Sequence, residues 1–588
     1  MFSMAPRSMN RLSRISLAPV WAAMASVLLS LAWLLPNHSM PWMSFHSDAW
    51  AAAMLVVMGG VVMVRARQSV AWHGLVWVVA LLLPLPFAHH ALGLLPFAGQ
   101  AWTASAYIAG FLLAMMVGQH WQGWRPRWMG DILFSAIGIG AIVSVALQFQ
   151  QWLEPGGDGT LSVWALGSNS ARPSGNMAQP NQLATLLLWG LLACAWGVWR
   201  RQLGRAAALI ATTFLLIGLA LTQSRTGALG LLVLLLAAWW WRGLWEAKNT
   251  PWYATGLALF YVLALLALGP LRSALMLDVS GSMVQRLGHE LRPELWRMLL
   301  DAALQRPWVG YGWNNVVAAQ VTVAEGYPAL YHPFLQSHNL FLDFMLWAGI
   351  PLGLVLTALV LAWLVTAARR IRRAPEGLYL LMVLMVGIHA MLELPLHYAY
   401  FLLPTGLAMG ALNASLNIWP MGSPSRIAGR WLLLGALCLG ATLLGLIARD
   451  YFKVESAYAS LQLERANIVN SRPAEPPDVL LLTDLREAQR FMKYEPVAGV
   501  SPAEIQWARD ATVVWPSSRS FMTLAVLLGL NQHPDEARDW LIKMCRIVPP
   551  DQCESAPARW AQARRFHPQL AAVEWPPEES ESASVITP

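Results

Sequence analysis

Long apolar segments of about twenty residues recur along most of the chain, separated by short polar segments rich in arginine. A helix of that length rises about 30 Å, which matches the hydrocarbon core of a bilayer. The pattern therefore predicts an all-α polytopic membrane protein. About 13 transmembrane helices are expected, near residues 16–35, 49–64, 69–88, 101–118, 131–149, 181–199, 206–222, 227–243, 253–270, 340–366, 378–396, 400–418 and 431–448.

Composition supports the same fold class. Charged residues make up 12% of the chain, about half the fraction usual in soluble domains, and the mean hydropathy is +0.46. The 32 tryptophans also fit a membrane protein, because indole rings favour the headgroup interface. The net charge of +8 resides largely in short loops, and no basic surface with interleaved aromatics is evident. Nucleic acid is therefore not expected as a partner.

The basic residues are distributed unevenly between the two sides of the predicted membrane. The N-terminus and the loops on its side hold 18 Lys and Arg residues, whereas the short loops opposite hold only Arg172 and Arg225. This asymmetry places the N-terminus in the cytoplasm and, after an odd number of crossings, the C-terminal tail in the periplasm. The first apolar segment follows Arg7, Arg11 and Arg14 with no small-x-small cleavage site after it, so it is expected to be an anchor.

Segments of lower hydropathy divide the chain further. We expect a membrane domain at 1–448, which includes a long periplasmic loop at 271–339, and a periplasmic helical domain at 449–588. A shorter outer segment lies at 150–180. Residues 516–549 resemble a tetratricopeptide helix pair, although a generic helical hairpin fits the same pattern.

The same tail region contains two specific features. Pro534 is expected to open the second helix of the pair. Cys545 and Cys553 would lie in an oxidising compartment, where they either form a disulfide or remain free thiols. The other two cysteines, Cys194 and Cys438, lie within predicted spans and are expected to be apolar filler.

Arg225, in the sequence QSRTG, stands at the outer end of a predicted span. A permanent cation on the side that otherwise lacks arginine needs a polar partner. One interpretation is an arginine that snorkels to lipid headgroups. The other is a guanidinium group that binds phosphate oxygens in bidentate fashion.

The long outer loop supplies a second set of candidates. The spacing of apolar residues predicts an amphipathic helix at 292–305, which begins at Arg292. Its apolar face could also simply lie on the membrane. The loop ends in SHN, which places His338 and Asn339 at the boundary between water and lipid. A lone histidine there is usually a polar anchor, but this one follows an arginine-rich loop.

Two further polar groups are expected on the same face. Glu393 lies at the outer end of a predicted span, four residues after His389, and an ionisable group there indicates function or an ion pair with arginine. The segment GNMAQPN, just after Arg172, contains three amides beside a helix start at Pro180, and one of them would suffice for capping. These amides are Asn176, Gln179 and Asn181.

The order of these motifs resembles the O-antigen ligase and polymerase superfamily. The resemblance rests on QSRTG, on Arg292 four residues before Trp296, on the glycines of PWVGYG, and on SHN followed by an apolar span. The GNMAQPN and ELPLHYAYF segments are similar to the bacterial protein O-oligosaccharyltransferases of the PglL type. The resemblance covers residues from about 170 to 410. It departs at Gln182, where that branch often carries histidine.

The resemblance implies a GT-C-like enzyme that moves an oligosaccharide en bloc from undecaprenyl pyrophosphate to Ser or Thr hydroxyls of periplasmic or pilin-like proteins. Arg225, Arg292 and His338 match the positions that the family needs, with Arg286 as the alternative second arginine. The chemistry is consistent, because two guanidinium groups can neutralise the leaving pyrophosphate and histidine can serve as a base. Direct displacement would invert the anomeric centre. Because the sequence has no D-x-D motif, we expect a metal-independent reaction, with no other cofactor.

The expected partners are the lipid-linked glycan donor, an acceptor protein and membrane lipids. The substrate-binding residues expected are Arg172, Gln179, Asn181, Arg225, Arg286, Arg292, Asn339 and Glu393. The alternatives are an O-antigen ligase that uses lipid A core as acceptor and a polymerase that joins repeat units. A transporter or flippase is the alternative of another class. It would carry charges near the bilayer midplane and an internal repeat, neither of which is evident.

Overall fold

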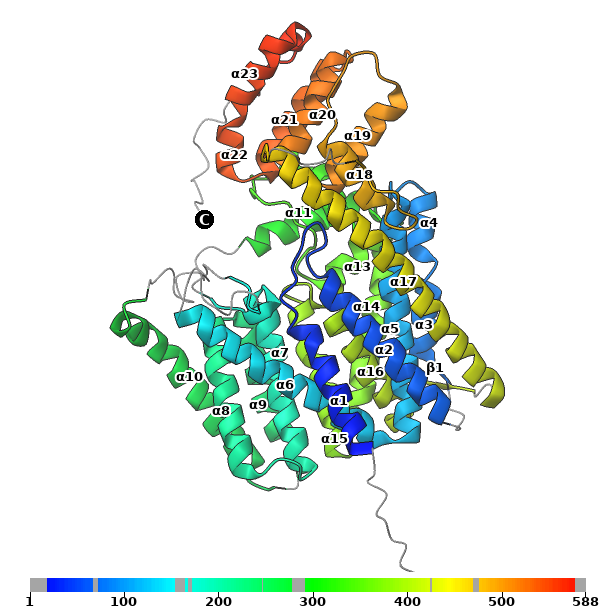
Figure 1. The fold of residues 1–588 in the computed structure, drawn as a ribbon, viewed down its shortest axis with the longest axis vertical. Helices are drawn as coiled ribbons and strands as arrows, with labels where there is room; N and C mark the ends of the chain where they lie inside the picture. The colour runs from blue at the N-terminus through cyan, green and yellow to red at the C-terminus, as the bar shows by residue number, and fades with distance from the viewer. Residues whose placement is uncertain are drawn as a thin grey trace, which may run out of the picture.

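The fold is taken from a computed structural model that describes residues 18–66, 72–153, 164–167, 172–245, 247–277, 291–422, 426–468 and 475–576. Its helices form a bundle that carries a smaller group of helices at one end (Figure 1). The bundle helices are α1 (Ala18–Ser30), α2 (Phe45–Arg65), α3 (Gly74–Leu82), α4 (Leu85–Ala91), α5 (Ala98–Trp124), α6 (Pro126–Leu153), α7 (Pro180–Trp199), α8 (Arg205–Thr222), α9 (Arg225–Trp240), α10 (Thr250–Ala274), α14 (Ile350–Arg370), α15 (Ala374–Ala390), α16 (Ala399–Leu416) and α17 (Arg426–Arg465).

The remaining elements are shorter. Helices α11 (Arg292–Gln305), α12 (Val316–Val323) and α13 (Leu340–Ala348) lie between the bundle and the tail (Figure 1). The tail consists of α18 (Thr483–Met492), α19 (Pro502–Val514), α20 (Ser518–Leu530), α21 (Pro534–Ile547), α22 (Pro550–Glu554) and α23 (Ala556–Phe566). Two short strands, β1 (Trp72–His73) and β2 (Pro420–Met421), pair in antiparallel register. The 3-10 turns are η1 (Leu31–Trp33), η2 (Gly175–Met177), η4 (Ala324–Gly326), η5 (Pro395–His397) and η6 (Pro568–Ala572).

The helix lengths confirm a polytopic membrane protein. In the described part of the chain, 10 helices are long and apolar enough to cross a bilayer. Three shorter apolar helices, at Val20–Trp33, Arg225–Trp240 and Ala374–Ala390, coincide with further predicted spans. The expectation of about 13 spans is consistent with this set and stays a prediction.

The predicted single helix at 340–366 is wrong. The helix is interrupted at Gly349, which has φ +81°. Helix α13 therefore folds back, and Met345 lies against Gly353 of α14. A side chain at Gly349 would lie 2.4 Å from the backbone of Trp308, because the preceding loop packs into the break. The Ile350 amide donates to the Pro307 carbonyl at 2.7 Å and completes this contact.

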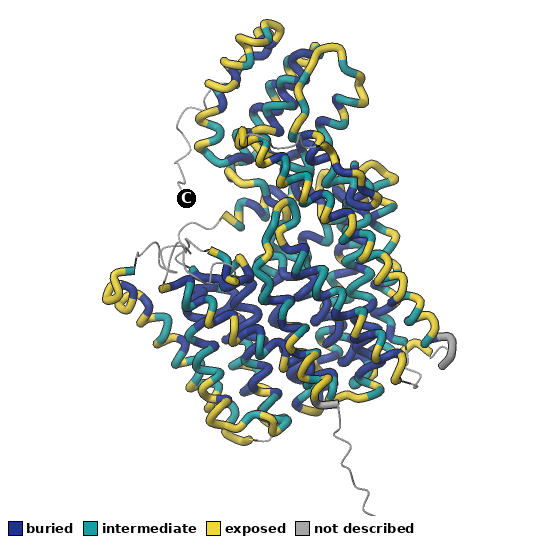
Figure 2. The backbone as a smooth tube through the Cα atoms, viewed as in Figure 1, coloured by how far each residue is buried: buried dark blue, intermediate teal, exposed yellow. Residues whose placement is uncertain are grey.

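Close backbone contacts hold the centre of the bundle together. Gly410 of α16 lies against the Met115 carbonyl of α5, and Gly118 of α5 lies against the Leu407 carbonyl. Small residues of this kind let membrane helices approach closely. Buried residues run through the middle of the bundle, whereas exposed residues gather at its ends and outer faces (Figure 2).

Helix α17 connects the bundle to the tail without a break, so the predicted domain boundary at 448 falls inside a helix. Asp450 of α17 is fully buried and accepts hydrogen bonds from the backbone amides of Leu480, Leu481 and Leu482. These hydrogen bonds hold the segment at residues 480–482, just before α18, against helix α17. The division into 1–448 and 449–588 stays a prediction.

The tail also contacts the bundle and its loops directly. The amide of Gly99, at the start of α5, donates to the Thr483 hydroxyl at 2.9 Å. The Arg546 carbonyl at the end of α21 accepts from the amides of Leu330 and Tyr331, at 3.1 and 3.2 Å. The tail is therefore attached to the loop that leads to His338.

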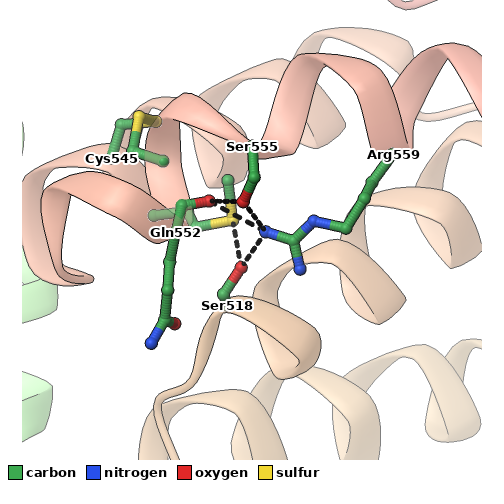
Figure 3. Close-up of a disulfide and its surroundings, with 7 residues drawn as sticks. Ser518, Cys545, Gln552, Ser555 and Arg559 are labelled. Atoms are coloured by element: carbon green, nitrogen blue, oxygen red, sulfur yellow. Dashed lines mark hydrogen bonds between the residues drawn. A yellow bond between two sulfur atoms is a disulfide. The ribbon is translucent and has the colours of Figure 1, made fainter.

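The predicted helix pair is confirmed as α20 and α21, and Pro534 is the first residue of the second helix. Cys545 and Cys553 form a disulfide that joins α21 to α22 (Figure 3). Beside it, Arg559 donates to the Ser518 hydroxyl at 2.7 Å and to the Gln552 carbonyl at 2.8 Å (Figure 3). Of the two thiols in predicted spans, that of Cys194 is buried, as expected of apolar filler, and that of Cys438 is exposed on α17.

Candidate functional site

Several of the predicted residues meet at the end of the bundle that faces the tail. We call this group the Glu393 cluster, and it comprises Arg172, Gln179, Asn181, Ser224, Arg292, His389 and Glu393. Its members come from the starts of α7, α9 and α11 and from the end of α15 (Figure 1).

Glu393 is the centre of this cluster. Helix α15 ends at Ala390, and the Glu393 amide donates back to the His389 carbonyl at 2.8 Å. The carboxylate accepts hydrogen bonds from the side-chain amides of Gln179 and Asn181. It also lies 3.6 Å from Nε2 of His389.

The surroundings of Glu393 favour its charged form. Burial would raise the pKa of this carboxyl, but the neighbouring imidazole of His389 and the hydrogen bonds from Asn181 and Gln179 hold the pKa below its ordinary value. An ionised carboxylate that is 11% exposed is an effective partner for a neighbouring cation.

That cation is Arg292, the first residue of α11. Its Nη2 lies 3.8 Å from Oε1 of Glu393, and its side chain is 21% exposed. The predicted amphipathic helix is confirmed, since its buried face contains Leu295, Met298, Leu299 and Ala302. Burial of this face fixes the helix, so Arg292 is held at the cluster by packing and by the ion pair.

Asn181 extends the cluster to a second arginine. Its Oδ1 accepts from Nη2 of Arg172 at 3.2 Å and from the Ser224 hydroxyl at 2.6 Å. Nε of Arg172 also donates to the Thr222 carbonyl at 2.8 Å. The start of α7 therefore bridges the carboxylate to the chain just before α9.

Arg225 is placed beside this bridge. It is the first residue of α9, and the preceding Ser224 caps the helix by accepting from the Gly227 amide at 3.0 Å. Because the Ser224 hydroxyl also donates to Asn181, the backbone at Arg225 is tied to the cluster. The side chain of Arg225 is half-buried.

His338 approaches the cluster from the loop before α13. Its backbone has φ +58°, and its Nδ1 lies 3.0 Å from the Leu392 carbonyl. A carbonyl only accepts, so Nδ1 carries the proton, and in the neutral ring Nε2 holds the free lone pair. Burial and the nearby Arg292 charge lower the pKa of His338, which favours that neutral form.

The loop around His338 is itself fixed by hydrogen bonds. The Ser337 amide donates to Oδ1 of Asp343 at 2.8 Å, and the Ser337 carbonyl accepts from the indole of Trp296 in α11 at 2.8 Å. The histidine and Arg292 are thus joined through the same helix.

The other predicted residues have separate positions. Asn339 caps α13, because its side-chain oxygen accepts hydrogen bonds from the backbone amides of Phe341 and Leu342. That oxygen is therefore occupied by the helix cap. Asn176 is buried apart from the cluster, where it donates to the carbonyls of Leu34 and Trp164. Arg286 lies outside the described residues.

Two residues of this site were not singled out from the sequence. Ser224 precedes Arg225 in QSRTG, and its capping position could have been recognised from a serine at a helix start. Thr185 lies one turn into α7 and binds Nδ1 of His389 at 2.8 Å, which no local signal indicates. Gln182, the departure from the family pattern, accepts from the Tyr400 hydroxyl at 2.7 Å.

The cluster combines features suited to an anionic substrate. The Arg292 guanidinium faces the Glu393 carboxylate, and the Arg172 guanidinium binds Asn181, which itself donates to that carboxylate. A neutral imidazole with an available lone pair, that of His338, lies next to them. Such an arrangement can neutralise a phosphate-bearing group while a base removes a proton nearby. Within the described residues, no group of three or more His, Cys, Asp or Glu side chains is placed to hold a metal ion.

Three family models match this chain. They are described as "Protein glycosylation ligase" (residues 173–196), "O-Antigen ligase" (residues 210–357) and "Virulence factor membrane-bound polymerase, C-terminal" (residues 377–561). The first contains Gln179 and Asn181, and the second contains Arg225, Arg292 and His338.

Two characterised proteins of Acinetobacter baylyi are similar to this chain. A general O-oligosaccharyltransferase is 29% identical over 556 residues, which cover 89% of this chain and 92% of that protein. A ComP-specific O-oligosaccharyltransferase is 29% identical over 298 residues, which cover 50% of this chain and 53% of that protein. Together with the matched models, these relatives make the chain similar to the bacterial protein O-oligosaccharyltransferases of the PglL type, within the O-antigen ligase superfamily.

Proposed function

We propose that this chain is a glycosyltransferase that moves an oligosaccharide en bloc from undecaprenyl pyrophosphate to Ser or Thr hydroxyls of periplasmic or pilin-like proteins. The transfer of glycan to protein follows from the family. The single observation that supports the chemistry is the meeting of Arg292, Glu393 and His338, which lie far apart in the sequence.

The donor is held by its pyrophosphate. Arg225 and Arg292 bind its oxygens through charge-assisted hydrogen bonds and neutralise the charge that develops as the sugar–phosphate bond breaks. Arg172, Gln179 and Asn181 line the same side of the site. Arg286, six residues before Arg292 in the sequence, is a further candidate for donor binding. Because guanidinium groups supply the positive charge, the reaction proceeds without a metal.

The acceptor is activated by His338. Its Nε2 takes the proton of a Ser or Thr hydroxyl, whose oxygen attacks the anomeric carbon while the pyrophosphate oxygen leaves with the bonding electrons. Direct displacement inverts the anomeric centre. Glu393 keeps Arg292 in place, and Asn339 fixes the start of α13 and so the loop that carries His338.

This chemistry requires a particular orientation. The N-terminus lies in the cytoplasm, and the Glu393 cluster lies at the periplasmic face of the inner membrane. The membrane domain at 1–448 performs the transfer, and residues 449–588 form a periplasmic domain. A reporter fused after residue 470 should be active only as a periplasmic reporter, and cytoplasmic activity there would overturn the orientation.

The function is tested by expressing the chain in a cell that makes a lipid-linked glycan, followed by intact-mass analysis of periplasmic proteins. Wild type should add the mass of the whole glycan. Arg225→Lys and Arg292→Lys keep the charge but lose the planar fork, so transfer should fall by about 10- to 100-fold. His338→Ala should abolish transfer while donor binding persists.

Arg297→Lys is the matched control. Arg297 lies on the exposed side of α11, with a side chain that is 76% exposed and paired with Glu294. Exposed pairs of this kind contribute little, so transfer should be unchanged. Near-normal transfer by both Arg225→Lys and Arg292→Lys would overturn the pyrophosphate assignment. Glycan on lipid A core, or glycan polymers with no modified protein, would instead favour the ligase or the polymerase.

A further inference from the structure

A cavity lined in part by charged residues lies at the opposite end of the bundle from the Glu393 cluster. Helix α7 begins beside that cluster and ends at Trp199 on the cavity wall, about 30 Å away at 1.5 Å per residue. The cavity has a volume of about 390 Å³ and is enclosed by the turn between α5 and α6, the start of α15 and the end of α16. This end of the bundle is the one that points away from the tail (Figure 1). We call it the Arg372 cavity.

The lining of the Arg372 cavity carries excess positive charge. Three arginines, Arg127, Arg372 and Arg373, line it together with one carboxylate, Glu376. Arg373 and Glu376 compensate each other through two side-chain hydrogen bonds of 2.8 and 2.6 Å. The Glu376 carboxylate also accepts from the backbone amides of Arg372 and Arg373. Among the described residues, no carboxylate is paired with Arg127 or Arg372, so their charges remain for another group.

Arg372 is already oriented by the protein. Its Nη1 donates to the carbonyls of Arg369 and Ile371, at 3.1 and 2.9 Å. Helix α6 begins at Pro126 and α15 begins at Ala374, so the positive ends of two helices also face this region.

Two buried polar atoms on the wall provide independent evidence for a ligand. The Tyr379 side chain is 1% exposed, and its hydroxyl has no hydrogen-bond partner among the described residues. The Oε1 atom of Gln122 has none either, although the amide nitrogen of Gln122 donates to the Ser415 hydroxyl at 2.7 Å. A buried polar group without a partner costs about 1–3 kcal/mol, so a ligand that satisfies both atoms would be stabilised.

We propose that the Arg372 cavity binds a phosphate-bearing anion, and that this ligand is the headgroup of an anionic phospholipid. The two guanidinium groups and the tyrosine hydroxyl are donors that match phosphate oxygens. The free Gln122 oxygen accepts from a headgroup hydroxyl, such as that of phosphatidylglycerol. Basic pockets between membrane helices bind anionic headgroups in this way.

The position and apolar lining favour a lipid over a soluble phosphate. The cavity lies at the ends of three candidate spans, at Trp124, Pro126 and Trp199, and the end of a span that crosses a bilayer lies at the depth of the headgroups. Its wall also contains Trp196, Trp199 and Leu244, which suit the glycerol and the first carbons of an acyl chain. A free phosphate would leave this apolar part of the wall uncovered.

The proposal is tested with the full-length protein purified in detergent, by measuring retention of added lipid with native mass spectrometry. Wild type should retain phosphatidylglycerol more strongly than phosphatidylcholine. Arg127→Gln and Arg372→Gln should each weaken that binding about fivefold. Tyr379→Phe, which removes only the hydroxyl, should weaken it by a similar factor.

Arg205→Gln is the matched control, because Arg205 is an exposed arginine at the same end of the bundle but outside the cavity. Equal retention by wild type, the three cavity variants and this control would overturn the proposal. Saturable binding of inorganic phosphate without selective retention of phosphatidylglycerol would assign the site to a soluble phosphate and overturn the lipid source. The experiment measures lipid retention and not glycan transfer, so its result does not depend on whether the proposed function is correct.

Discussion

Replacing Glu393 by glutamine tests whether the carboxylate positions Arg292. The substitution keeps the shape of the side chain but removes its charge. In the wild type, each carboxylate oxygen of Glu393 accepts a hydrogen bond from a side-chain amide nitrogen, one from Gln179 and one from Asn181. In the Glu393→Gln variant, one of those oxygens becomes an NH2 group. This NH2 group would lie against the amide nitrogen of Gln179 or Asn181, and because both groups are donors, that hydrogen bond is lost.

The magnitude follows from two contributions. At 3.8 Å, the attraction between Arg292 and Glu393 is about 4 kcal/mol for an effective dielectric constant of about 20. That value exceeds the rotamer entropy of a free arginine, about 2 kcal/mol, so the ion pair can hold the guanidinium in one position. A charge-assisted hydrogen bond contributes a further ~1.5–3 kcal/mol, and at least one is lost. Displacement of Arg292 by about 1 Å would reduce turnover about 100-fold.

Donor binding should respond differently from turnover. Removal of a carboxylate raises the net positive charge of the cluster, so the affinity for lipid-linked pyrophosphate should stay the same or increase. The assay is glycan transfer to a purified acceptor in proteoliposomes, combined with equilibrium binding of the donor. We expect the Glu393→Gln variant to lose about 10- to 100-fold in turnover while it binds donor at least as tightly.

Glu325→Gln is the control for this experiment. Glu325 pairs with Lys543 at 3.3 Å, but its side chain is 46% exposed, so loss of the pair should change neither quantity. Normal turnover in Glu393→Gln would refute the positioning role. A parallel loss of donor affinity would mean that Glu393 acts on the donor by some route other than Arg292.

Three further predictions concern acidity, backbone geometry and the disulfide. Because burial lowers the pKa of His338, its neutral basic form persists below the ordinary value of about 6.5. The rate of transfer should therefore be flat around neutral pH and fall only below that value, and a midpoint above 6.5 would contradict the assignment of the base. Gly349→Ala should lower the thermal unfolding temperature, because its φ of +81° is left-handed and its new carbon would meet the Trp308 backbone, whereas Gly326→Ala, with open space around it, should not. Joint replacement of Cys545 and Cys553 by serine should destabilise the tail by about 2–3 kcal/mol in protease-resistance assays, and alkylation of wild type before reduction should label neither thiol.

The elements that the sequence predicted best are those set by local periodicity. Helix α11 is an example, because the spacing of Leu295, Met298, Leu299 and Ala302 alone defines its buried face. Pro180 and Pro534 likewise mark the starts of α7 and α21, since proline fits the first turn of a helix.

The break at Gly349 shows where local patterns fail. Residues 340–366 are almost uniformly apolar, so a window of hydropathy favours one continuous span. The break depends on a loop from a different part of the chain, whose Pro307 carbonyl and Trp308 backbone occupy the space that a straight helix would fill. Gly349 and Pro351 are local signals of such a break, since Pro351 lies in the first turn of α14, but the contact with the loop at Pro307 and Trp308 cannot be read from the span itself.

The site was predictable as a list of residues but not as a set of contacts. Arg292, His338 and Glu393 could each be placed on the same side of the membrane from charge and motif. The roles of the connecting atoms were not visible, because Oδ1 of Asn181 and the carbonyl of Leu392 become partners only through the tertiary backbone. A carbonyl oxygen is present at every residue, so composition cannot indicate which one binds a histidine.

The segment that links α15 to α16 explains why base and cation are positioned together. Leu392 binds His338 through its carbonyl, and the next residue, Glu393, faces Arg292 through its carboxylate. The segment is held at both ends, since the Met391 amide donates to α15 and the Ala399 amide donates to Oδ1 of Asp48 at 2.5 Å.

Consecutive residues on such a short, doubly anchored segment cannot move independently. The distance between the group that accepts the hydroxyl proton and the group that neutralises the pyrophosphate is therefore set by one piece of backbone. The Asp48 carboxylate anchors the far end of this segment, and its hydrogen bonds are to Ser44, Tyr107 and Ala399, not to His338 or Arg292. Asp48→Asn should nevertheless disturb His338 and Arg292 together, because it shifts the segment that positions both. The site then behaves as one unit because its base and its cation are positioned by the same segment of backbone.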